Sequence, residues 1–383
     1  MALTITREEQ LRERKHPLYN DRALKLGTFS TNLSGGCSMS TIDGVLEATW
    51  DQTTALARMG EEMEFEALVP VGRWRGFGGA TNFNGAGFEC FTWAAGQAAQ
   101  TEKAGVFVTS HVPTIHPVMA AKQISTIDHI SSGRVALNVV TGWNAAEIEM
   151  FGAPLLPHDE RYAVAQEWID IVRALWTRDD PFSFEGKYYH VKDAILRPKP
   201  VQQPYPALMN AGSSAAGRNF GARNCDVVFI SSDIGQKTPE GMSEKVAQFK
   251  RLAREEYGRD IQVWVNAYIV EGDTEADANA FLDYYANQHG DWEAATNLVD
   301  GLMGGSASYD PQTMEQMKLH FIAGWGGYPI VGTQAQVVDS LIALSATGLD
   351  GVLLSWPRYI EGMREFRDVT YPLLKQAGLR DQL

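Results

Sequence analysis

Small residues and hydroxyl groups begin a helix-like stretch at AGSSAAGR, residues 211–218. Small side chains let a ligand approach the backbone closely, and the free N–H groups of a helix N-terminus favour an anion such as phosphate. Ser214 suits that position, although serine also caps helices when nothing binds. A second candidate lies at HDERY, residues 158–162, where Arg161 offers a planar fork and Tyr162 a hydroxyl to phosphate oxygens. An exposed helix start with an acidic first turn is the alternative for that segment.

Two expected strands carry a polar residue among apolar ones. Asn138 lies in the middle of RVALNVVTGW (134–143), and Thr109 lies in GVFVTSHV (105–112). A buried amide must be hydrogen-bonded, so Asn138 either satisfies the backbone or faces a ligand. Threonine is common in strands, so Thr109 has an ordinary structural alternative.

Other catalytic signatures do not occur in the sequence. There is no HExxH, no GxSxG and no Walker loop, and the three cysteines are widely spaced. His111 and His116 share one connection without a nearby carboxylate cluster, so no metal site is predicted. Trp74, Trp143 and Trp325 lie in Gly-rich segments, where flat surfaces line a site. Phosphate-type binding without an obvious nucleophile is typical of an enzyme whose cofactor supplies the chemistry.

The composition restricts the partners. The net charge of −14, from 33 Lys and Arg against 47 Asp and Glu, disfavours nucleic acid as a partner. No apolar stretch approaches the ~20 residues of a membrane span, and the polar N-terminus does not look like a secretory signal. We therefore expect a cytoplasmic protein with no membrane partner.

Eight short β-branched or aromatic runs alternate with helical patterns, which predicts a (β/α)8 TIM barrel. The runs lie at residues 24–30, 65–71, 105–112, 134–140, 207–212, 226–231, 261–270 and 349–355. A doubly wound sheet is the alternative, but it usually carries GxGxxG after its first strand, and GTFSTNLSGG does not match.

The chain is longer than a bare barrel. Residues 1–23 are charged and turn-rich, which predicts an arm outside the core or on another subunit, and residues 24–383 are expected to form a single domain. Because a barrel takes about 250 residues, the surplus is expected in insertions. They are predicted near residues 72–87, 142–158, 182–206 and 285–332.

Five segments together resemble the bacterial-luciferase-like flavin-dependent monooxygenases: RGFGG (75–79), STIDHISSGR (125–134), NVVTGW (138–143), HDERY and AGSS. The likeness runs from Leu24 to about Leu374, and within the family it looks closest to the enzymes that open the pyrimidine ring. The resemblance implies a TIM barrel that binds reduced FMN at its C-terminal face. It also implies O2 as co-substrate, a separate NAD(P)H-dependent flavin reductase as partner, and a homodimer or homotetramer.

Residue roles carried over from the resemblance fall into three groups. The implied flavin contacts are Gly72, Arg73, Asn138, Glu147, Arg161, Tyr162 and Ser214. Thr109 and Asn138 match the positions that hold O2 beside the flavin. The implied substrate pocket comprises Val69, Trp74, His111, His116 and Trp143.

The predicted function is an FMNH2-dependent monooxygenase that oxygenates a small N-heterocyclic or amide-like compound through a flavin peroxide, with ring or bond cleavage. Gly72 and Arg73 stand where the pyrimidine enzymes have Ile and Lys, so the resemblance does not identify uracil as the substrate. One alternative is a sulfonate or sulfone monooxygenase that cleaves a C–S bond, in which Arg73, Arg75 and His111 bind an anionic head group. The others are a deazaflavin-dependent dehydrogenase and a barrel that only binds a ligand.

Overall fold

Eight parallel strands close into a barrel in the computed structural model, which describes residues 6–230, 238–303 and 310–380. Around the barrel the order is β1, β2, β3, β4, β7, β8, β9 and β11, which pairs again with β1. Their bounds are Lys25–Phe29, Ala67–Val69, Gly105–His111, Val135–Val140, Ala207–Asn210, Val227–Ile230, Gln262–Glu271 and Gly351–Ser355. Each strand matches a predicted one, so the (β/α)8 barrel is confirmed.

Some predicted segments extend beyond the described residues. These are residues 1–5 of the arm, residue 231 at the end of the sixth expected strand, residues 304–309 of the last insertion, and residues 381–383.

Helices cover the outside of the barrel, and capping residues set several of their ends. They are α2 (Trp50–Glu62), α3 (Cys90–Ala98), α4 (Pro117–Ile130), α6 (His158–Thr177), α7 (Ala215–Asn224), α8 (Pro239–Tyr257), α12 (Gln334–Ala346), α13 (Tyr359–Glu365) and α14 (Tyr371–Gln376). Thr49 and Thr238 cap α2 and α8, and Thr333 forms a capping box with Gln336 on α12. No helix within the described ranges is long and apolar enough to cross a membrane.

The insertions contribute elements of their own. Residues 142–158 contain α5 (Ala145–Met150), and residues 182–206 contain the antiparallel hairpin of β5 (Phe182–Glu185) and β6 (His190–Ala194), as predicted. The last insertion is mostly helical. After α9 (Glu275–Leu282) come a π-helical turn (Asp283–Gln288), α10 (Trp292–Met303), α11 (Pro311–Gly324) and β10 (Tyr328–Gly332). Strand β10 was not predicted; it pairs with the C-terminal half of β9.

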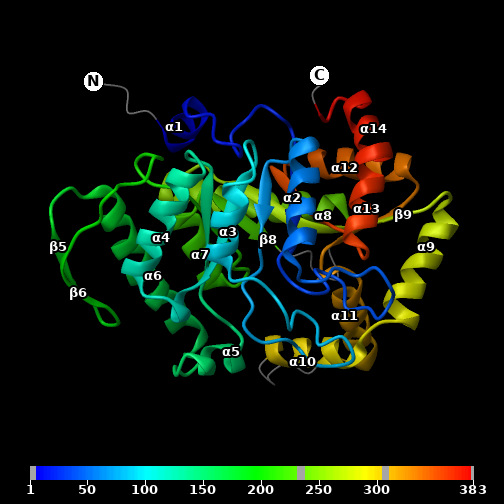
Figure 1. Ribbon diagram of the computed structural model, residues 1–383, viewed down its shortest axis with the longest axis horizontal. Coiled ribbons are helices and arrows are strands. Elements are labelled where there is room, and N and C mark those ends of the chain that lie inside the picture. The colour runs from blue at the N-terminus through cyan, green and yellow to red at the C-terminus, as the bar shows by residue number, and fades with distance from the viewer. Residues whose placement is uncertain (1–5, 231–237, 304–309, 381–383) are drawn as a thin grey trace.

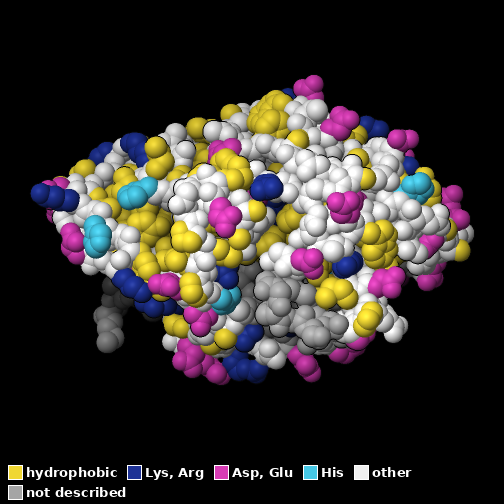
Figure 2. Space-filling model, turned by 90° about the horizontal axis from the view of Figure 1, so that it is seen from below, with side chains coloured by type: hydrophobic (Ala, Val, Ile, Leu, Met, Phe, Trp, Pro, Cys, Tyr) yellow, Lys and Arg dark blue, Asp and Glu magenta, His cyan; other side chains and the backbone are white. Residues whose placement is uncertain are grey.

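Different helices lie at the two ends of the barrel. Helices α5 and α10 lie at the bottom of the view in Figure 1, opposite α1 (Arg7–Glu13) at the top. The face seen from below carries scattered side chains of both charges (Figure 2).

The N-terminal segment closes one end of the barrel, so the expectation that it lies outside the core is wrong for residues 6–23. Leu11 and Leu18 are fully buried and belong to the core inside the barrel. Gln262 Nε2, at the start of β9, donates to the carbonyl of Leu18 over 2.6 Å. Arg7 pairs with Asp226, just before β8, at 3.4 Å. The segment therefore plugs the N-terminal ends of the strands.

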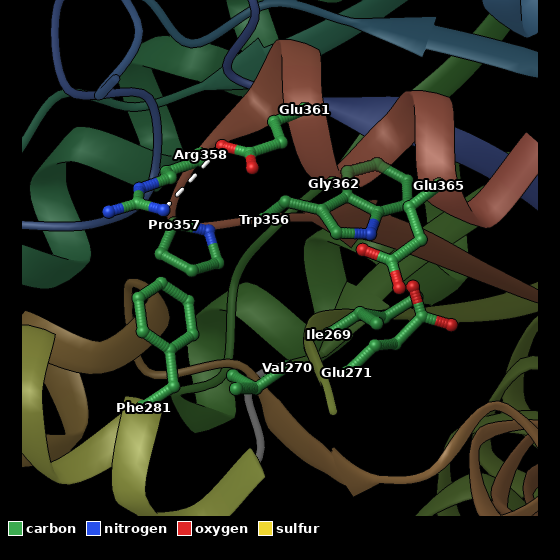
Figure 3. Close-up of a pocket in the computed structure, with 10 residues that line it drawn as sticks. All are labelled: Ile269, Val270, Glu271, Phe281, Trp356, Pro357, Arg358, Glu361, Gly362 and Glu365. Carbon is green, nitrogen blue, oxygen red and sulfur yellow. Dashed lines mark ion pairs between the residues drawn. The ribbon is translucent and has the colours of Figure 1, made fainter. Parts of the chain in front are cut away.

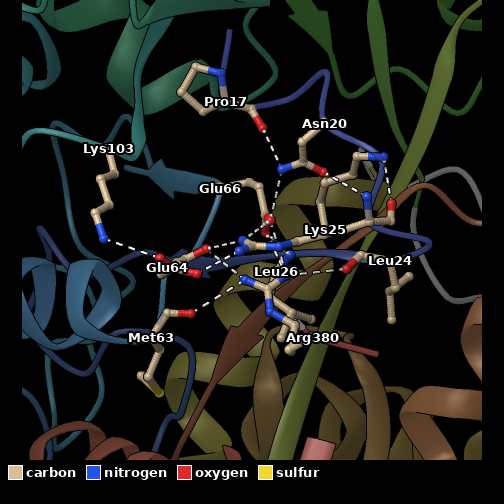
Figure 4. A network of polar contacts seen from close by, with 11 residues as sticks. Pro17, Asn20, Leu24, Lys25, Leu26, Met63, Glu64, Glu66, Lys103 and Arg380 are labelled. Atoms are coloured by element: carbon tan, nitrogen blue, oxygen red, sulfur yellow. Dashed lines mark hydrogen bonds and ion pairs between the residues drawn. The ribbon is translucent and has the colours of Figure 1, made fainter. Parts of the chain in front are cut away.

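A buried carboxylate joins both ends of the chain at this face (Figure 4). Glu66 Oε2 accepts the N–H of Leu26 over 2.8 Å, and its carboxylate pairs with Arg380 at 3.0 Å. Arg22 lies 2.8 Å from Glu66 Oε1 and 2.6 Å from the carboxylate of Glu64. Because each charge is paired and hydrogen-bonded, burial of Glu66 and Arg380 is compensated.

A pocket outside the barrel lies beside the C-terminal ends of β9 and β11 (Figure 3). None of the predicted site residues lines it. Glu271 Oε1 accepts a hydrogen bond from the hydroxyl of Thr370, and Glu271 Oε2 has no partner among the described residues. Burial raises the pKa of Glu271 to about 7, and the nearby carboxylate of Glu365 adds to the rise.

Replacing Glu271 should make the protein more stable at alkaline pH. Because the pKa of Glu271 is higher in the folded state, unfolding releases a proton between about pH 4.5 and 7, and the free energy of unfolding falls as pH rises through this window. Glu271→Gln keeps an acceptor for Thr370 but cannot ionise. We expect it to raise the unfolding free energy by up to about 3 kcal/mol at pH 8 and hardly at all near pH 4.5.

Urea unfolding at pH 5 and pH 8 measures this difference. Glu361→Gln, which changes an exposed carboxylate of the same pocket, is the control. A gain from Glu271→Gln that is equal at both pH values would contradict the prediction.

Candidate active site

The inward faces of β3 and β4 change from apolar to polar toward their C-terminal ends. Phe107 and Ala136 belong to the core inside the barrel, and strand alternation places Thr109 and Asn138 on the same faces. The two polar residues are register partners, and Asn138 Nδ2 donates to Thr109 Oγ1 over 3.2 Å. Thr109 donates in turn to the carbonyl of Pro70. Within the described residues Asn138 Oδ1 has no partner, so the pair presents an unused acceptor.

One buried carboxylate anchors the start of the Gly-rich loop at residues 72–87. Glu147, in the first turn of α5, accepts the N–H groups of Trp74 and Arg75 at 2.7 and 3.2 Å. Its other oxygen pairs with Arg73 at 3.1 Å, and both charged side chains are 2% exposed. Burial lowers the pKa of Arg73, and Glu147 acts in the opposite direction. The two charges compensate each other inside the site.

Three aromatic rings surround the Arg73 guanidinium. Its central carbon lies 4.8, 5.1 and 5.7 Å from the ring centroids of Phe77, Trp143 and Trp325. The rings of Phe77 and Trp143 stack at 6.1 Å with an interplanar angle of 12°. Trp325 ends α11 with a φ of 55°, a left-handed conformation that bulky residues rarely adopt. The stacked rings and the ion pair hold Arg73 in place together.

A second carboxylate holds the far side of the same loop. Asp291 Oδ2 accepts both the N–H and the hydroxyl of Thr81, each at 2.7 Å. Gly79 has a φ of 69°, and a Cβ there would lie 2.2 Å from Asp291 Oδ1, so a side chain would displace the carboxylate. Asn297, in α10, donates to the carbonyl of Phe77 over 2.7 Å. The loop is thus tied to α5 on one side and to α10 on the other.

The predicted phosphate-binding residues lie at the starts of α6 and α7. Ser214 caps α7 and accepts the N–H of Gly217 over 3.1 Å. A Cβ added at Gly217 would lie 2.6 Å from Tyr162 Oη, so glycine makes room for the tyrosine. Burial raises the pKa of Tyr162, while hydrogen bonding to neighbouring hydroxyls, including that of Ser214, lowers it. Arg161 donates to the carbonyl of Gly142, and its Nε has no partner among the described residues.

The other predicted pocket residues lie in different surroundings. His111 ends β3 and is buried, and burial lowers its pKa to about 4. Val69 is buried inside the barrel. The Trp74 ring is 41% exposed and packs edge-on against Phe151. His116 is exposed and caps α4. The structure therefore places His111 and Val69 inward and Trp74 and His116 at the surface.

Asn210 and Asp291 also shape the site, although sequence analysis did not identify them. Asn210, at the end of β7, donates to the carbonyl of Val139 over 2.7 Å and accepts the N–H of Gly212 over 2.9 Å. Asn210 could have been identified in the sequence as Asn138 was, because it is an amide at the end of an apolar strand. Asp291 had no such signal. Across the described ranges, no group of three or more His, Cys, Asp or Glu side chains is placed to hold a metal ion.

The model of one known family, described as luciferase-like monooxygenase, matches residues 24–351. The chain belongs to the luciferase-like monooxygenase family. The predicted family, fold and enzyme class are confirmed by this match.

Similar family members act on different substrates. The chain is 30% identical to an FMNH2-dependent dimethylsulfone monooxygenase of Pseudomonas putida, over 92% of this chain and 96% of the relative. It is also 30% identical to pyrimidine monooxygenase RutA of Cronobacter turicensis, over 92% and 93%. The crystal structure of DmoA from Hyphomicrobium sulfonivorans has a TM-score of 0.80 at 23% identity, over 94% and 90% of the two chains. The chain is equally identical to a relative named for a sulfone and to one named for a pyrimidine. We therefore infer its substrate from the residues of the site.

Removing the Glu147 carboxylate should release the start of the Gly-rich loop. Glu147→Ala deletes the acceptor for two loop amides and leaves Arg73 buried without its partner, a loss of about 3–5 kcal/mol in other buried pairs. We expect hydrogen exchange of the amides at residues 73–79 to accelerate by roughly tenfold or more.

Hydrogen-exchange mass spectrometry of this loop provides the measurement. Glu149→Ala, at an exposed position of the same helix, is the matched control and should leave the exchange rates unchanged. Equal exchange rates in the two variants would show that Glu147 is not the anchor.

Proposed function

We propose that the chain is a two-component monooxygenase that uses reduced FMN and O2 to oxygenate a small molecule. The observation that carries the proposal is the set of buried polar atoms without partners at the C-terminal ends of β3 and β4 and in the segments that follow β2 and β4. Within the described residues, they include Asn138 Oδ1, Arg73 Nε, His111 Nδ1 and Arg161 Nε. Buried polar atoms are normally hydrogen-bonded, so their clustering at one end of the barrel favours a polar ligand there. Relatives named as FMNH2-dependent support flavin as that ligand.

The residues present fit FMN at both of its ends. Ser214, which caps α7, and Tyr162, whose hydroxyl lies beside Gly217 in the first turn of α7, are suited to the phosphate, because helix N-termini attract anions and hydroxyls donate to phosphate oxygens. Arg161 would add a charge-assisted contact. Gly72 and Asn138 would hold the flavin ring. Bound in this way, reduced FMN would supply the redox chemistry with O2.

The protein itself would position groups and exclude water. The Thr109–Asn138 hydrogen bond fixes both side chains on the inward face, where we propose that they hold O2. The loop at residues 72–87, tied to α5 and α10, would cover the site and keep water out. We propose no general acid or base role for Thr109 or Asn138.

Other parts of the proposal concern partners and organisation. An NAD(P)H-dependent flavin reductase would supply the reduced FMN, and we propose that the reaction takes place in the cytoplasm. Residues 24–383 would form the single catalytic domain, and the chain would assemble as a homodimer or homotetramer.

The phosphate site can be tested by comparing reduced FMN with reduced riboflavin, which lacks the phosphate. Ser214→Ala and Arg161→Ala should weaken binding of reduced FMN, each by roughly tenfold or more, because each removes a hydrogen bond to a charged group. Binding of riboflavin should stay unchanged. Anaerobic fluorescence titration measures both affinities.

Ser213→Ala, at an exposed position one residue earlier, is the control and should bind both flavins as the wild type does. Equal losses for FMN and riboflavin would contradict a phosphate role for Ser214 and Arg161.

The oxygen-holding role predicts uncoupling. Thr109→Ala and Asn138→Ala should consume reduced FMN at near-normal rates but yield less product and more hydrogen peroxide, with the product ratio falling by roughly tenfold. The ratio of product to flavin oxidised, with dimethylsulfone and uracil as trial substrates, is the measurement.

Thr109→Ser keeps the hydroxyl and should retain most of the coupling, and Thr126→Ala on the exposed face of α4 serves as the control. Full coupling in both alanine variants would show that the pair does not hold O2.

A further inference from the structure

His111 and Gly72 form a continuous wall beside the Thr109–Asn138 pair. His111 lies two residues beyond Thr109 on β3, so its side chain shares the inward face. The backbone of Gly72 lies against both. A Cβ added at Gly72 would lie 3.4 Å from His111 Cε1 and 3.5 Å from Thr109 Cγ2. A molecule lying over the polar pair would therefore meet His111 directly.

The imidazole of His111 is buried, uncharged and incompletely bonded. It is 5% exposed, and among the described residues its Nδ1 has no partner. Burial lowers the pKa of His111 to about 4, while Glu147 raises it and Arg73 lowers it further. At neutral pH the ring offers one N–H donor and one acceptor nitrogen. Since buried polar nitrogens are normally hydrogen-bonded, we expect a ligand atom to hydrogen-bond to Nδ1 of His111.

Arg73, the buried cation whose charge lowers the pKa of His111, is already neutralised by an ion pair. Arg73 is paired with Glu147 at 3.1 Å, and both side chains are 2% exposed. An anion that entered here would give up its hydration for a site without net positive charge, and it would be repelled by Glu147. Arg75 does not change this balance, because its side chain is exposed to water.

We propose that the substrate is an uncharged molecule with an acceptor oxygen, of the carbonyl or sulfonyl type, and that His111 orients it by donating a hydrogen bond. The inference rests on the proposed function, whose oxygen-holding pair lies on the same wall. Asn138 Oδ1 adds an acceptor on this face, so lactams and amides with an N–H group fit as well. Alkanesulfonates, which carry a full negative charge, do not fit.

Dimethylsulfone and methanesulfonate test the charge of the substrate, because they are similar in size and shape but only the second is an anion. Uracil is a second neutral probe. Each is titrated calorimetrically into the wild-type enzyme, without flavin and with reduced FMN under anaerobic conditions. We expect at least one neutral probe to bind about tenfold or more tightly than methanesulfonate in both forms. Equal or tighter binding of methanesulfonate, or no binding of either neutral probe, overturns the proposal.

Variants of His111 test the orienting role. His111→Leu removes the N–H group at similar volume and should weaken the neutral probe by about tenfold. His111→Gln keeps a donor and should recover most of the affinity. His190→Leu, at an exposed position of the β5–β6 hairpin, makes the same exchange away from the site and should bind as the wild type does. Unchanged affinity in His111→Leu overturns the role of His111.

Glu147→Gln provides the converse test, because it keeps an acceptor for the loop amides but leaves the charge of Arg73 uncompensated. Methanesulfonate should then gain affinity relative to dimethylsulfone by about tenfold. An unchanged preference would overturn the argument from charge compensation.

Flavin binding is measured separately, so that the two proposals can fail independently. His111→Leu should bind reduced FMN as the wild type does, and a parallel loss would assign His111 to the cofactor and overturn its role toward the substrate. If the wild type failed to bind reduced FMN, the proposed function would be wrong, whereas the flavin-free titrations would still decide the charge of the substrate.

Discussion

The register between β3 and β4 is the constraint on which the candidate site depends. Successive side chains of a strand point to opposite faces, so the pairing of Thr109 with Asn138 places both inside the barrel. A slip of one residue in either strand would turn its polar side chain into the helix layer, where Val108 and Leu137 now pack. The apolar packing of that layer therefore fixes the polar pair. Core packing therefore determines that Thr109 and Asn138 lie side by side, and their hydrogen bond follows from this placement.

The candidate site also depends on the negative charge of Glu147, which compensates the charge of Arg73. A buried guanidinium without a partner would draw water or an anion into the site, and a loop without an anchor would open. The same carboxylate prevents both, because it pairs with Arg73 and accepts two amides of the loop. It belongs to α5, a helix of six residues inside an insertion. A short insertion thus determines both the shape of the loop and the charge that a ligand meets.

The barrel could be predicted from the sequence because eight buried parallel strands leave eight apolar runs at regular spacing. Asn138 and Thr109 were found because they interrupt such runs. The pairing of Arg73 with Glu147 joins a loop residue to a residue of α5, 74 positions apart, and no local pattern encodes it. Their predicted role as cofactor contacts came from the family resemblance alone. The buried position of Leu11 and Leu18 was missed because charged neighbours dominate that segment. Strand β10 was missed because a Pro and two flanking glycines make YPIVG look like a turn.

The two ends of the candidate site rest on different kinds of support. At the proposed phosphate end, Ser214 caps α7 and the hydroxyl of Tyr162 packs against Gly212 and Gly217, so a side chain at either glycine would displace the tyrosine. At the proposed substrate end, Gly72 and Arg73 lie in a loop, and His111 is the last residue of its strand. Loop and strand-end residues can change without disturbing the barrel core. This division would explain how one family retains a scaffold while its members differ in substrate. On the proposals above, the determinants of specificity would lie in the segment after β2 and at the end of β3.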